Sequence, residues 1–242
     1  MQAWFESLWA DFHLNFIQAN RWKYLVDGLG ATLIITLLSG VMGTIIGVVI
    51  AMVRSTYDKT AEGARKTFGR FIFTIIDRIC RVYLTVLRGT PVVVQLMIIY
   101  FVIFAWSDNG IMVAALAFGL NSGAYVAEIV RGGIMSIDNG QFEAGRSLGF
   151  NYVQTMRFIV IPQVIKNVLP SLANEFIALL KETSVAGYVA VQDLTKGGDI
   201  IRSRTYSPFL PLLAVAAIYL ALVMFFSWLV SKLERRLRNS DH

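Results

Sequence analysis

Long apolar stretches alternate with shorter polar segments along the chain, and this pattern predicts several membrane-spanning helices. The clearest stretch, residues 28–53, carries no charged side chain. About 20 predominantly apolar residues suffice for an α-helix to cross the hydrocarbon core of a bilayer. The same pattern predicts four further spans, two of them interrupted by polar residues, at 92–106, 111–134, 167–190 and 208–230.

The segments between these stretches predict connections at the membrane surface. The chain is basic over 54–81, and from about Thr67 apolar residues separate the arginines, which predicts a loop followed by an amphipathic surface helix. The sequence Arg88-Gly89-Thr90-Pro91 is expected to bend the chain, because proline removes a backbone donor and disfavours helix at the preceding residue. Residues 191–207 are expected to form a polar loop.

The N-terminal segment, residues 1–27, is rich in tryptophan, tyrosine and phenylalanine. Tryptophan and tyrosine favour the interface between membrane and water. We therefore expect this segment to lie along one face of the membrane, with a loosely ordered terminus as the alternative.

Residues 138–170 stand between two predicted spans and carry their own helix start and stop signals. Asp138 and Asn139 can cap a helix, Gly149 can end it in the left-handed conformation, and Asn151 can cap the next one. These signals predict two short helices with a glycine bend. The segment is longer than a connection between two helices requires, which predicts a protruding surface.

The composition supports a membrane protein, and the distribution of charge orients it. The chain is 56% hydrophobic and 16% charged, with a mean hydropathy of +0.60, whereas a soluble domain carries about 25% charged residues. The net charge of +6 alone would also suit nucleic acid. Fifteen lysines and arginines lie in 54–81, 131–166 and 232–238, against five in the opposite set of segments. Because positive charge favours the cytoplasmic side, we expect five spans, an external N-terminus and a cytoplasmic C-terminus.

Several kinds of catalytic chemistry are excluded by what the sequence lacks. The chain has a single cysteine, Cys80, and its two histidines lie near the ends, at His13 and His242. A thiolate metal cluster or a histidine-based site is therefore not expected. The phosphate-binding pattern GxxxxGK[ST] is absent, as is HExxH. We predict that the chain is not an enzyme and that any ATP-driven step depends on another polypeptide.

One motif in residues 138–170 resembles that of a known family. Glu143-Ala144-Gly145 is followed at fixed spacing by Gly149 and by Ile159-Val160-Ile161-Pro162. This arrangement resembles the EAA motif of permease subunits from binding-protein-dependent ABC importers, which reads EAA, three residues, G, nine residues, I-x-L-P. The sequence departs from it at Gly145, where the family has alanine, and at Ile161, where it has leucine.

Further stretches resemble the permeases of polar amino-acid importers, the histidine and glutamine type. Arg88-Gly89-Thr90-Pro91 with Gln95 looks like their RGTP segment, and residues 121–134 are similar to their third span. Asn174-Glu175-Phe176 and residues 180–184 look like their fourth. The resemblance covers about residues 25–235.

This resemblance implies an all-α integral membrane protein with the type I ABC importer fold. It implies an interfacial segment at 1–27, a transmembrane domain at 28–235 with a cytoplasmic coupling loop at about 138–165, and a tail at 236–242. The coupling loop would contact a separate ABC ATPase, which binds ATP and Mg²⁺, and this chain would hold no cofactor. The other implied partners are a second permease subunit, identical or different, and a periplasmic or lipid-anchored amino-acid-binding protein at a bacterial inner membrane.

Within the coupling loop, each motif residue has an expected role. We expect Gly149 to set the geometry, and Ala144 and Gly145 to allow close approach to the ATPase. Glu143 pairs with Arg146 or contacts the partner. A short helix that only joins two spans is the alternative.

Polar residues inside the spans are candidates for the substrate pathway, because such residues are costly in a bilayer. Asn121, Tyr125 and Glu128 share one helix face. A structural role is equally open for Asn121 and Tyr125, and an ion pair of Glu128 with Arg131 is favoured over a pathway role.

In the fourth predicted span, Glu175 is the expected partner of the substrate ammonium group. Thr183 and Ser184 are the expected donors to its carboxylate. Lys181 and Glu182 fit pairing between helices or subunits better than substrate binding. The sequence leaves open which amino acid is carried.

Two other functions remain as alternatives. A channel or ion-driven carrier would transport in liposomes without an ATPase, and an assembly or signalling scaffold would not stimulate ATP hydrolysis. The spacing of the EAA motif favours the importer over both.

Overall fold

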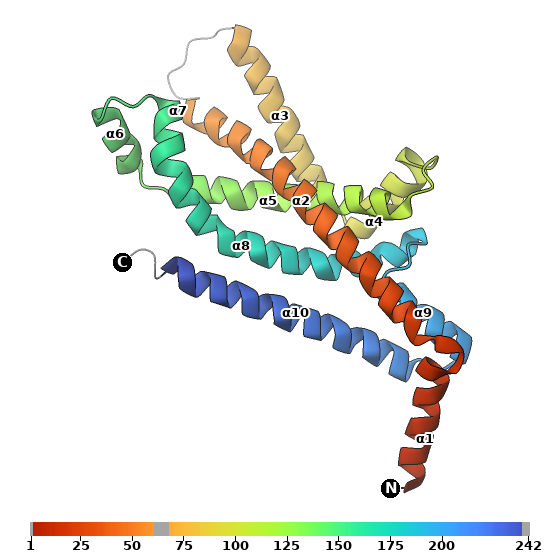
Figure 1. The fold of residues 1–242 in the computed structure, drawn as a ribbon. Helices are drawn as coiled ribbons and strands as arrows, with labels where there is room; N and C mark the ends of the chain where they lie inside the picture. The colour runs from red at the N-terminus through yellow and green to blue at the C-terminus, as the bar shows by residue number, and fades with distance from the viewer. Residues whose placement is uncertain (1, 61–67, 239–242) are drawn as a thin grey trace. The chain divides into compact units, whose positions relative to one another are not determined.

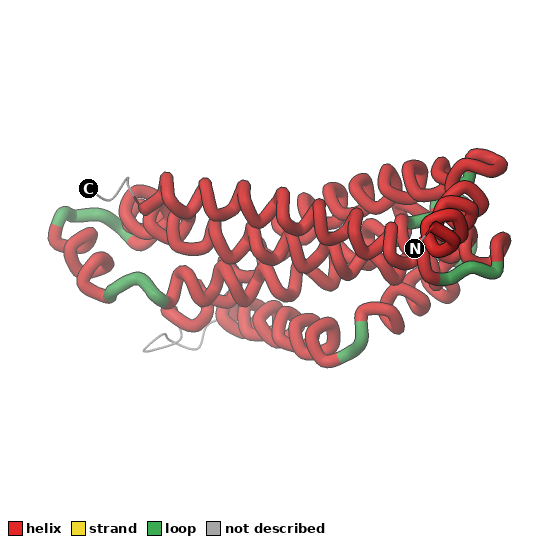
Figure 2. Tube along the Cα trace, turned by 90° about the horizontal axis from the view of Figure 1, so that it is seen from below, coloured by secondary structure: helices red, strands yellow, loops and turns green. Residues whose placement is uncertain are grey.

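The computed structural model describes residues 2–60 and 68–238, and helices joined by short loops make up most of this part of the chain (Figure 2). Figure 1 labels the α-helices in chain order. Their bounds are α1 Gln2–Phe12, α2 Trp22–Thr60, α3 Phe68–Gly89, α4 Val92–Ile98, α5 Gly110–Met135, α6 Asn139–Ser147, α7 Tyr152–Thr155, α8 Ile161–Glu182, α9 Leu194–Thr205 and α10 Phe209–Arg238. π-helical turns occur at His13–Ile17, Ile99–Ile103 and Met156–Val160, and 3-10 turns at Gln18–Asn20 and Thr183–Val189.

Among the described residues, three helices are long and apolar enough to cross a membrane. They are α2, α5 and α10, and the broken pair of α3 and residues 92–103 makes up to four. The spans expected at 28–53, 111–134 and 208–230 are therefore confirmed as helices of spanning length. α8 does not meet the same criterion, since Lys166, Glu175, Lys181 and Glu182 lie within it. The count of five spans remains a prediction.

The bend expected at the Arg88–Pro91 sequence is confirmed. α3 ends at Gly89, and α4 begins at Val92, after Pro91. The helix expected from about Thr67 is also present as α3, although residues 61–67 lie outside the part of the chain that the structure describes.

Three details of the sequence prediction are wrong. Residues 191–207 contain the helix α9 rather than only a loop. α2 begins at Trp22, inside the segment expected to precede the first span. The second helix of the coupling loop is not a separate short one, because helical backbone continues from α7 through the π-helical turn into α8.

The chain divides into two compact units, which are described separately. The first unit comprises Met1–Ser39, Val92–Phe118 and Ile177–Trp228. Its core joins the N-terminal segment to α2, α9 and α10 through five buried side chains: Phe16, Leu25, Leu194, Ile201 and Val215. The buried Asn15 amide donates to Ser207 Oγ at 3.2 Å, and its carbonyl accepts from Thr205 Oγ1 at 2.8 Å. Residues 13–17 are therefore part of this core, which excludes a loosely ordered terminus there.

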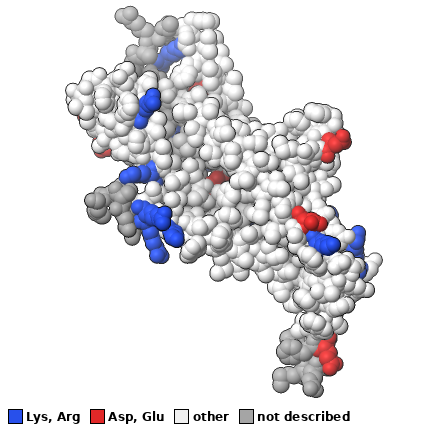
Figure 3. Space-filling view, viewed as in Figure 1, with Lys and Arg blue, Asp and Glu red and all other residues white. Residues whose placement is uncertain are grey.

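The second unit comprises Gly40–Pro91, Gly119–Phe176 and Leu229–His242. Its main core lies between the C-terminal parts of α2 and α5 and the first part of α8, with Ala51, Val130 and Val164 among its members. Small residues permit this packing: a Cβ at Gly133 would collide with Val168. On the face shown in Figure 3 most of the surface is uncharged, which suits contact with lipid.

Candidate functional site

The coupling loop, residues 138–165, begins with the capped helix that the sequence predicts. Asp138 accepts a hydrogen bond from the Gly140 N–H at 2.6 Å and thereby caps α6. At the other end, the Phe150 N–H donates to Gly145 O at 3.0 Å and the Gly149 N–H to Arg146 O at 2.9 Å. These two bonds form a Schellman motif. Gly149 has a φ of 79°, which confirms the expected left-handed bend.

The next helix, α7, also begins with the cap that the sequence predicts. The Gln154 N–H donates to Asn151 Oδ1, and the Asn151 N–H donates to Gln154 Oε1, both at 2.9 Å. This reciprocal pair is a capping box. Both ends of the Gly149 bend are therefore held by local hydrogen bonds, which makes the loop a defined surface.

The motif residues divide into an exposed set and a buried one. Glu143 and Ala144 are exposed on α6, whereas Gly145 is buried. A Cβ at Gly145 would lie 2.6 Å from Thr155 Oγ1, so the close approach that this glycine permits is between α6 and α7. Ile159 is half-buried in the π-helical turn, and Pro162 is exposed at the start of α8.

Exposed apolar side chains surround the Gly149 bend, and the sequence analysis missed them. Leu148 is 70% exposed, Val153 70% and Phe158 60%. Large apolar residues gathered on an exposed loop are typical of a protein-binding surface. Their exposure could not be read from the sequence, because buried and half-buried apolar residues stand among them in the same segment.

A cluster of arginines and carboxylates joins α2, α3 and α5 in the second unit. Arg81 Nε lies 2.7 Å from Asp77 Oδ2, and Arg54 Nη1 lies 3.2 Å from Glu128 Oε1. The full set, named the arginine–carboxylate cluster, is Arg54, Asp58, Asp77, Arg81, Arg88, Glu128 and Arg131. The expected pair of Glu128 with Arg131 is confirmed at 3.3 Å. The sequence analysis missed Arg81 with Asp77, which are four residues apart in α3, and it could not show the remaining pairs, because these join different helices.

Asp58 connects this cluster to the coupling loop. Its two carboxylate oxygens lie 3.7 Å from Arg81 and from Arg131. It also lines a cavity of about 630 Å³ together with Arg146 of α6 and Tyr152 of α7. Asp58 therefore lies on the wall of a cavity shared with the loop and also pairs with α3 and α5.

The predicted pathway residues of α5 and α8 occupy two different environments in the second unit. Asn121 donates to Leu87 O at 3.2 Å, and the Arg88 guanidinium lies 5.7 Å from the ring centroid of Tyr125. Both therefore pack against the end of α3. Glu175 instead accepts a hydrogen bond of 2.9 Å from Ser122 Oγ. Ser122 is buried and was missed by the sequence analysis, although it adjoins Asn121.

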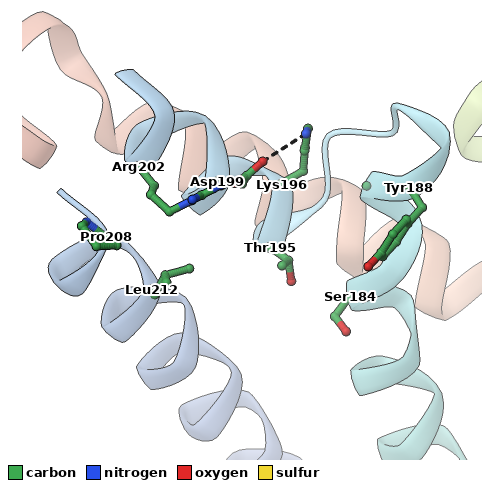
Figure 4. A pocket seen from close by; sticks show the side chains of 9 residues that line it. Ser184, Tyr188, Thr195, Lys196, Asp199, Arg202, Pro208 and Leu212 are labelled. Carbon is green, nitrogen blue, oxygen red and sulfur yellow. Dashed lines mark hydrogen bonds and ion pairs between the residues drawn. The ribbon is translucent and has the colours of Figure 1, made fainter. Parts of the chain in front are cut away.

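Thr183 and Ser184, the expected donors to the substrate carboxylate, also lie in different environments. Thr183 is fully buried, and its hydroxyl donates to Leu180 O at 2.8 Å, so its proton is not available to a substrate in this conformation. Ser184 lines a pocket of about 490 Å³ in the first unit. Figure 4 shows Ser184 and Tyr188 on one side of this pocket, α9 above it, and opposite them Pro208, which precedes α10, and Leu212 of α10.

Charged side chains of α9 form one wall of this pocket, named the outer pocket. The Asp199 carboxylate accepts hydrogen bonds from Lys196 Nζ at 3.1 Å and from Arg202 Nη2 at 2.5 Å. The hydrogen bonds from Arg202, and then from Lys196, lower the pKa of Asp199. Thr195 adds a hydroxyl group from α9, and Ser184 adds one from the other side of the pocket (Figure 4). The pocket therefore offers cations, an anion and hydroxyls, the groups that a zwitterion requires.

Asp193 begins α9 and is the other acidic residue of this region. It accepts from the Lys196 N–H at 2.7 Å and caps the helix. Its other oxygen, Oδ2, is buried without a hydrogen-bond partner among the described residues. Burial raises the pKa of Asp193 to about 6.

Comparison with known proteins shows which family and which relatives this chain is similar to. Residues 67–239 match the family described as binding-protein-dependent transport system inner membrane component. The chain is 35% identical over 217 residues to a putative glutamine transport system permease protein of Rickettsia bellii, covering 88% of this chain and 93% of the relative. It is 34% identical over 221 residues to the arginine transport system permease protein of Bacillus subtilis, covering 90% and 94%.

Solved structures have the same fold. The chain superposes with a TM-score of 0.78 and 38% identity on a chain of an amino-acid ABC transporter crystallised with histidines, over 91% of this chain and 98% of that one. A chain of the MetNI methionine ABC transporter in an inward-facing conformation gives a TM-score of 0.72 at 20% identity, which shows the shared fold alone.

Proposed function

The chain belongs to the family of inner membrane components of binding-protein-dependent transport systems, and from this premise we propose how it works as a permease subunit of an amino-acid ABC importer. It forms the translocation pathway for a polar L-amino acid. It couples through α6 and α7 to a separate ATPase, which binds ATP and Mg²⁺. A binding protein delivers the substrate on the external side. The named relatives carry glutamine or arginine, which favours a polar amino acid here.

The defined shape of the coupling loop is the observation that carries this proposal. A surface that transmits force between proteins must hold its shape under load. The caps at Asp138 and Asn151 and the Schellman motif at Gly149 fix the loop by local hydrogen bonds. The exposed Leu148, Val153 and Phe158 around it provide the apolar contact for the ATPase.

Coupling then reaches the membrane helices through Asp58. This residue lines the cavity beside Arg146 and Tyr152 of the coupling loop. It also pairs with Arg81 of α3 and Arg131 of α5. Movement of the loop on ATP binding shifts these ion pairs and so repositions α2, α3 and α5 within this unit.

The substrate pathway uses polar groups at two places. The Glu175 carboxylate, held by Ser122, binds the substrate ammonium group. The outer pocket, with Lys196, Asp199 and Ser184, accepts the zwitterion on the external side. Tyr125 and Asn121 contribute through α5, as the sequence predicts.

In the membrane, we propose five spans with the N-terminus outside and the C-terminus in the bacterial cytoplasm. α8 would be the additional span, because it is a helix of 22 residues, although it contains charged side chains. Its length is about the minimum that a bilayer requires. A single native cysteine, Cys80, makes the topology measurable by labelling of introduced cysteines in a Cys80→Ser background.

Reconstitution tests the function directly. The purified chain is placed in liposomes with an ABC ATPase from the same transport system and with its binding protein. ATP-dependent uptake of labelled glutamine or arginine, lost when either partner is omitted, is the expected result. Uptake driven by an ion gradient in liposomes that lack the ATPase would instead establish the ion-driven carrier.

Glu175→Gln tests the assigned pathway within the same assay. We expect about a tenfold or larger loss of uptake, because a charge-assisted contact to the ammonium is removed. The Ser122→Ala variant keeps the Glu175 carboxylate and should therefore lose less uptake. Full uptake by Glu175→Gln, with normal assembly and normal ATP hydrolysis, would remove Glu175 from the pathway.

A further inference from the structure

A third pocket, with arginine as its commonest lining residue, lies between α2, α3 and α5 of the second unit. Its volume is about 470 Å³, and three arginines line it, Arg54, Arg81 and Arg88. Glu128 is the one carboxylate on its wall, and Thr85 adds a hydroxyl-bearing side chain. This pocket, named the arginine pocket, is a different cavity from the outer pocket, which belongs to the first unit.

The charges around the arginine pocket are unbalanced. The arginine–carboxylate cluster has four guanidinium groups and three carboxylates. Asp77 is buried under two of the arginines, with 3% of its side chain exposed. Arg88 is held only loosely, 3.9 Å from Glu128, and 44% of its side chain is exposed. One positive charge is therefore left over, and it is on the open side.

One arginine of the pocket wall also has a buried donor that is not fully satisfied. Arg54 Nε is buried and has no hydrogen-bond acceptor among the described residues, although Asp77 Oδ1 lies at 3.6 Å as an ion pair. Buried donors without acceptors are uncommon in folded proteins. Arg88, which lines the pocket and is 44% exposed, is the guanidinium group that an anion there would contact, and such an anion would neutralise the excess charge.

The surroundings indicate what kind of molecule carries the anion. Arg81, Thr85 and Arg88 lie at i, i+4 and i+7 and so share one face of α3. Val82, three residues before Thr85, lies next to this face and is 62% exposed, and the exposed Val86 and Ile79 lie farther round the helix. The anion site thus adjoins an exposed apolar surface, which matches a molecule with an anionic head and apolar chains.

We propose that the arginine pocket binds the phosphate group of an anionic phospholipid. Arginine presents a planar fork of donors that matches phosphate oxygens, and basic pockets between membrane helices on the cytoplasmic side hold lipid head groups. In the orientation proposed above, the pocket lies on that side. The acyl chains pack along Val82 and Val86. Lipid bound there bridges α2, α3 and α5, the helices that the coupling loop moves.

Native mass spectrometry of the purified transporter measures the binding. The chain, in complex with its partners, is exchanged into detergent with phosphatidylglycerol or phosphatidylcholine, and the retained lipid is counted. Thr85→Glu places a carboxylate in the pocket without removing any arginine. We expect it to weaken phosphatidylglycerol retention about tenfold, the effect of losing one charge-assisted contact. Thr85→Gln, of the same shape but neutral, should bind within about twofold of the wild type.

A second pair of variants removes one positive charge at two places on α3. Arg88→Gln should weaken phosphatidylglycerol retention, whereas Arg78→Gln, which is exposed outside the pocket, should not. Equal retention in all four variants would overturn the proposal, as would equal retention of phosphatidylcholine and phosphatidylglycerol. Displacement of the lipid by millimolar inorganic phosphate would identify free phosphate, rather than lipid, as the ligand. Displacement by the transported amino acid would instead make the pocket part of the substrate pathway.

Discussion

The coupling loop and the α9 segment are both short capped helices between longer ones, but they are held in different ways. α6 ends at Ser147 and is followed by Gly149, whose φ of 79° is natural for glycine. The α9 segment is bounded by Ala190 at φ 59° and Tyr206 at φ 55°. A side chain in the left-handed region costs about 1–2 kcal/mol. The α9 segment therefore contains strain that the coupling loop avoids.

Packing explains how the α9 segment tolerates this strain. Leu194 and Ile201 are fully buried in the core of the first unit. The N-terminal segment also contacts it, since Asn15 bonds both Thr205 and Ser207. The coupling loop instead exposes most of its side chains and depends on local caps. Local sequence thus determines the coupling loop, whereas distant parts of the chain determine α9.

Gly197→Ala is expected to have the largest effect on stability, because α9 depends on close packing. A Cβ at Gly197 would collide with the backbone carbonyl of Tyr24 in α2, and a backbone cannot move aside as a flexible side chain can. We expect a loss of about 3 kcal/mol, at the upper end for overpacking. Thermal unfolding of the purified chain in detergent measures it.

Gly132→Ala is the matched control for this change. Gly132 is exposed in α5, and a Cβ there meets nothing within 4 Å. Alanine in a helix is more stable than glycine by about 0.5–1 kcal/mol. A melting temperature for Gly197→Ala equal to that of Gly132→Ala would show that α9 does not require close contact with α2.

Gly149→Val should leave the fold largely intact but uncouple ATP hydrolysis from transport. No atom lies within 4 Å of a Cβ at Gly149, so the cost is the positive φ alone, about 1–2 kcal/mol. The bend relaxes, and the exposed surface around it changes shape. We expect about a tenfold loss of ATP-driven uptake in proteoliposomes. Gly149→Asn, which tolerates this φ, should retain most of the uptake, and wild-type uptake by Gly149→Val would exclude a coupling role for the bend.

The fold could be predicted from sequence wherever the signal is local. The spans at 28–53, 111–134 and 208–230 follow from long apolar stretches, and the bend at Gly149 follows from its cap residues. α9 was missed because Gly197 and Gly198 resemble loop residues, although both are required by close packing: a Cβ at Gly198 would collide with Val215. The residues with positive φ at its two ends, Ala190 and Tyr206, are not glycines, so the sequence does not mark these turns. A short stretch of sequence does not reveal these contacts between residues that are distant along the chain.

The candidate site shows the same division. Helical spacing was sufficient to pair Glu128 with Arg131. It could not show that Arg54 and Arg88 also reach Glu128, since these contacts cross between helices. For Thr183, the sequence showed a hydroxyl group inside a predicted span, but it could not show that this hydroxyl donates to Leu180 O.

The smallest expected effect is a dependence of stability on pH that is specific to the α9 segment. Burial raises the pKa of Asp193 from 3.8 to about 6. The folded state therefore binds this proton more tightly than the unfolded state does. The contribution to stability is fully present below pH 3.8 and is lost as the pH rises through about 6. Asp193→Asn, which can still cap α9, should remove this slope, as measured by thermal unfolding between pH 4 and 7.

Asp199→Asn gives the control of opposite sign on the same helix. Arg202 and Lys196 lower the pKa of Asp199, so its contribution is present above the pKa of the unfolded chain, 3.8, and is lost as the pH falls through the lower folded value. The difference in melting temperature between wild type and Asp199→Asn should thus shrink as the solution is acidified. The difference for Asp193→Asn should instead change between pH 4 and 7. If both variants followed the wild-type curve in parallel, neither carboxylate would titrate with folding, and the strain at Ala190 and Tyr206 would have to be offset by packing alone.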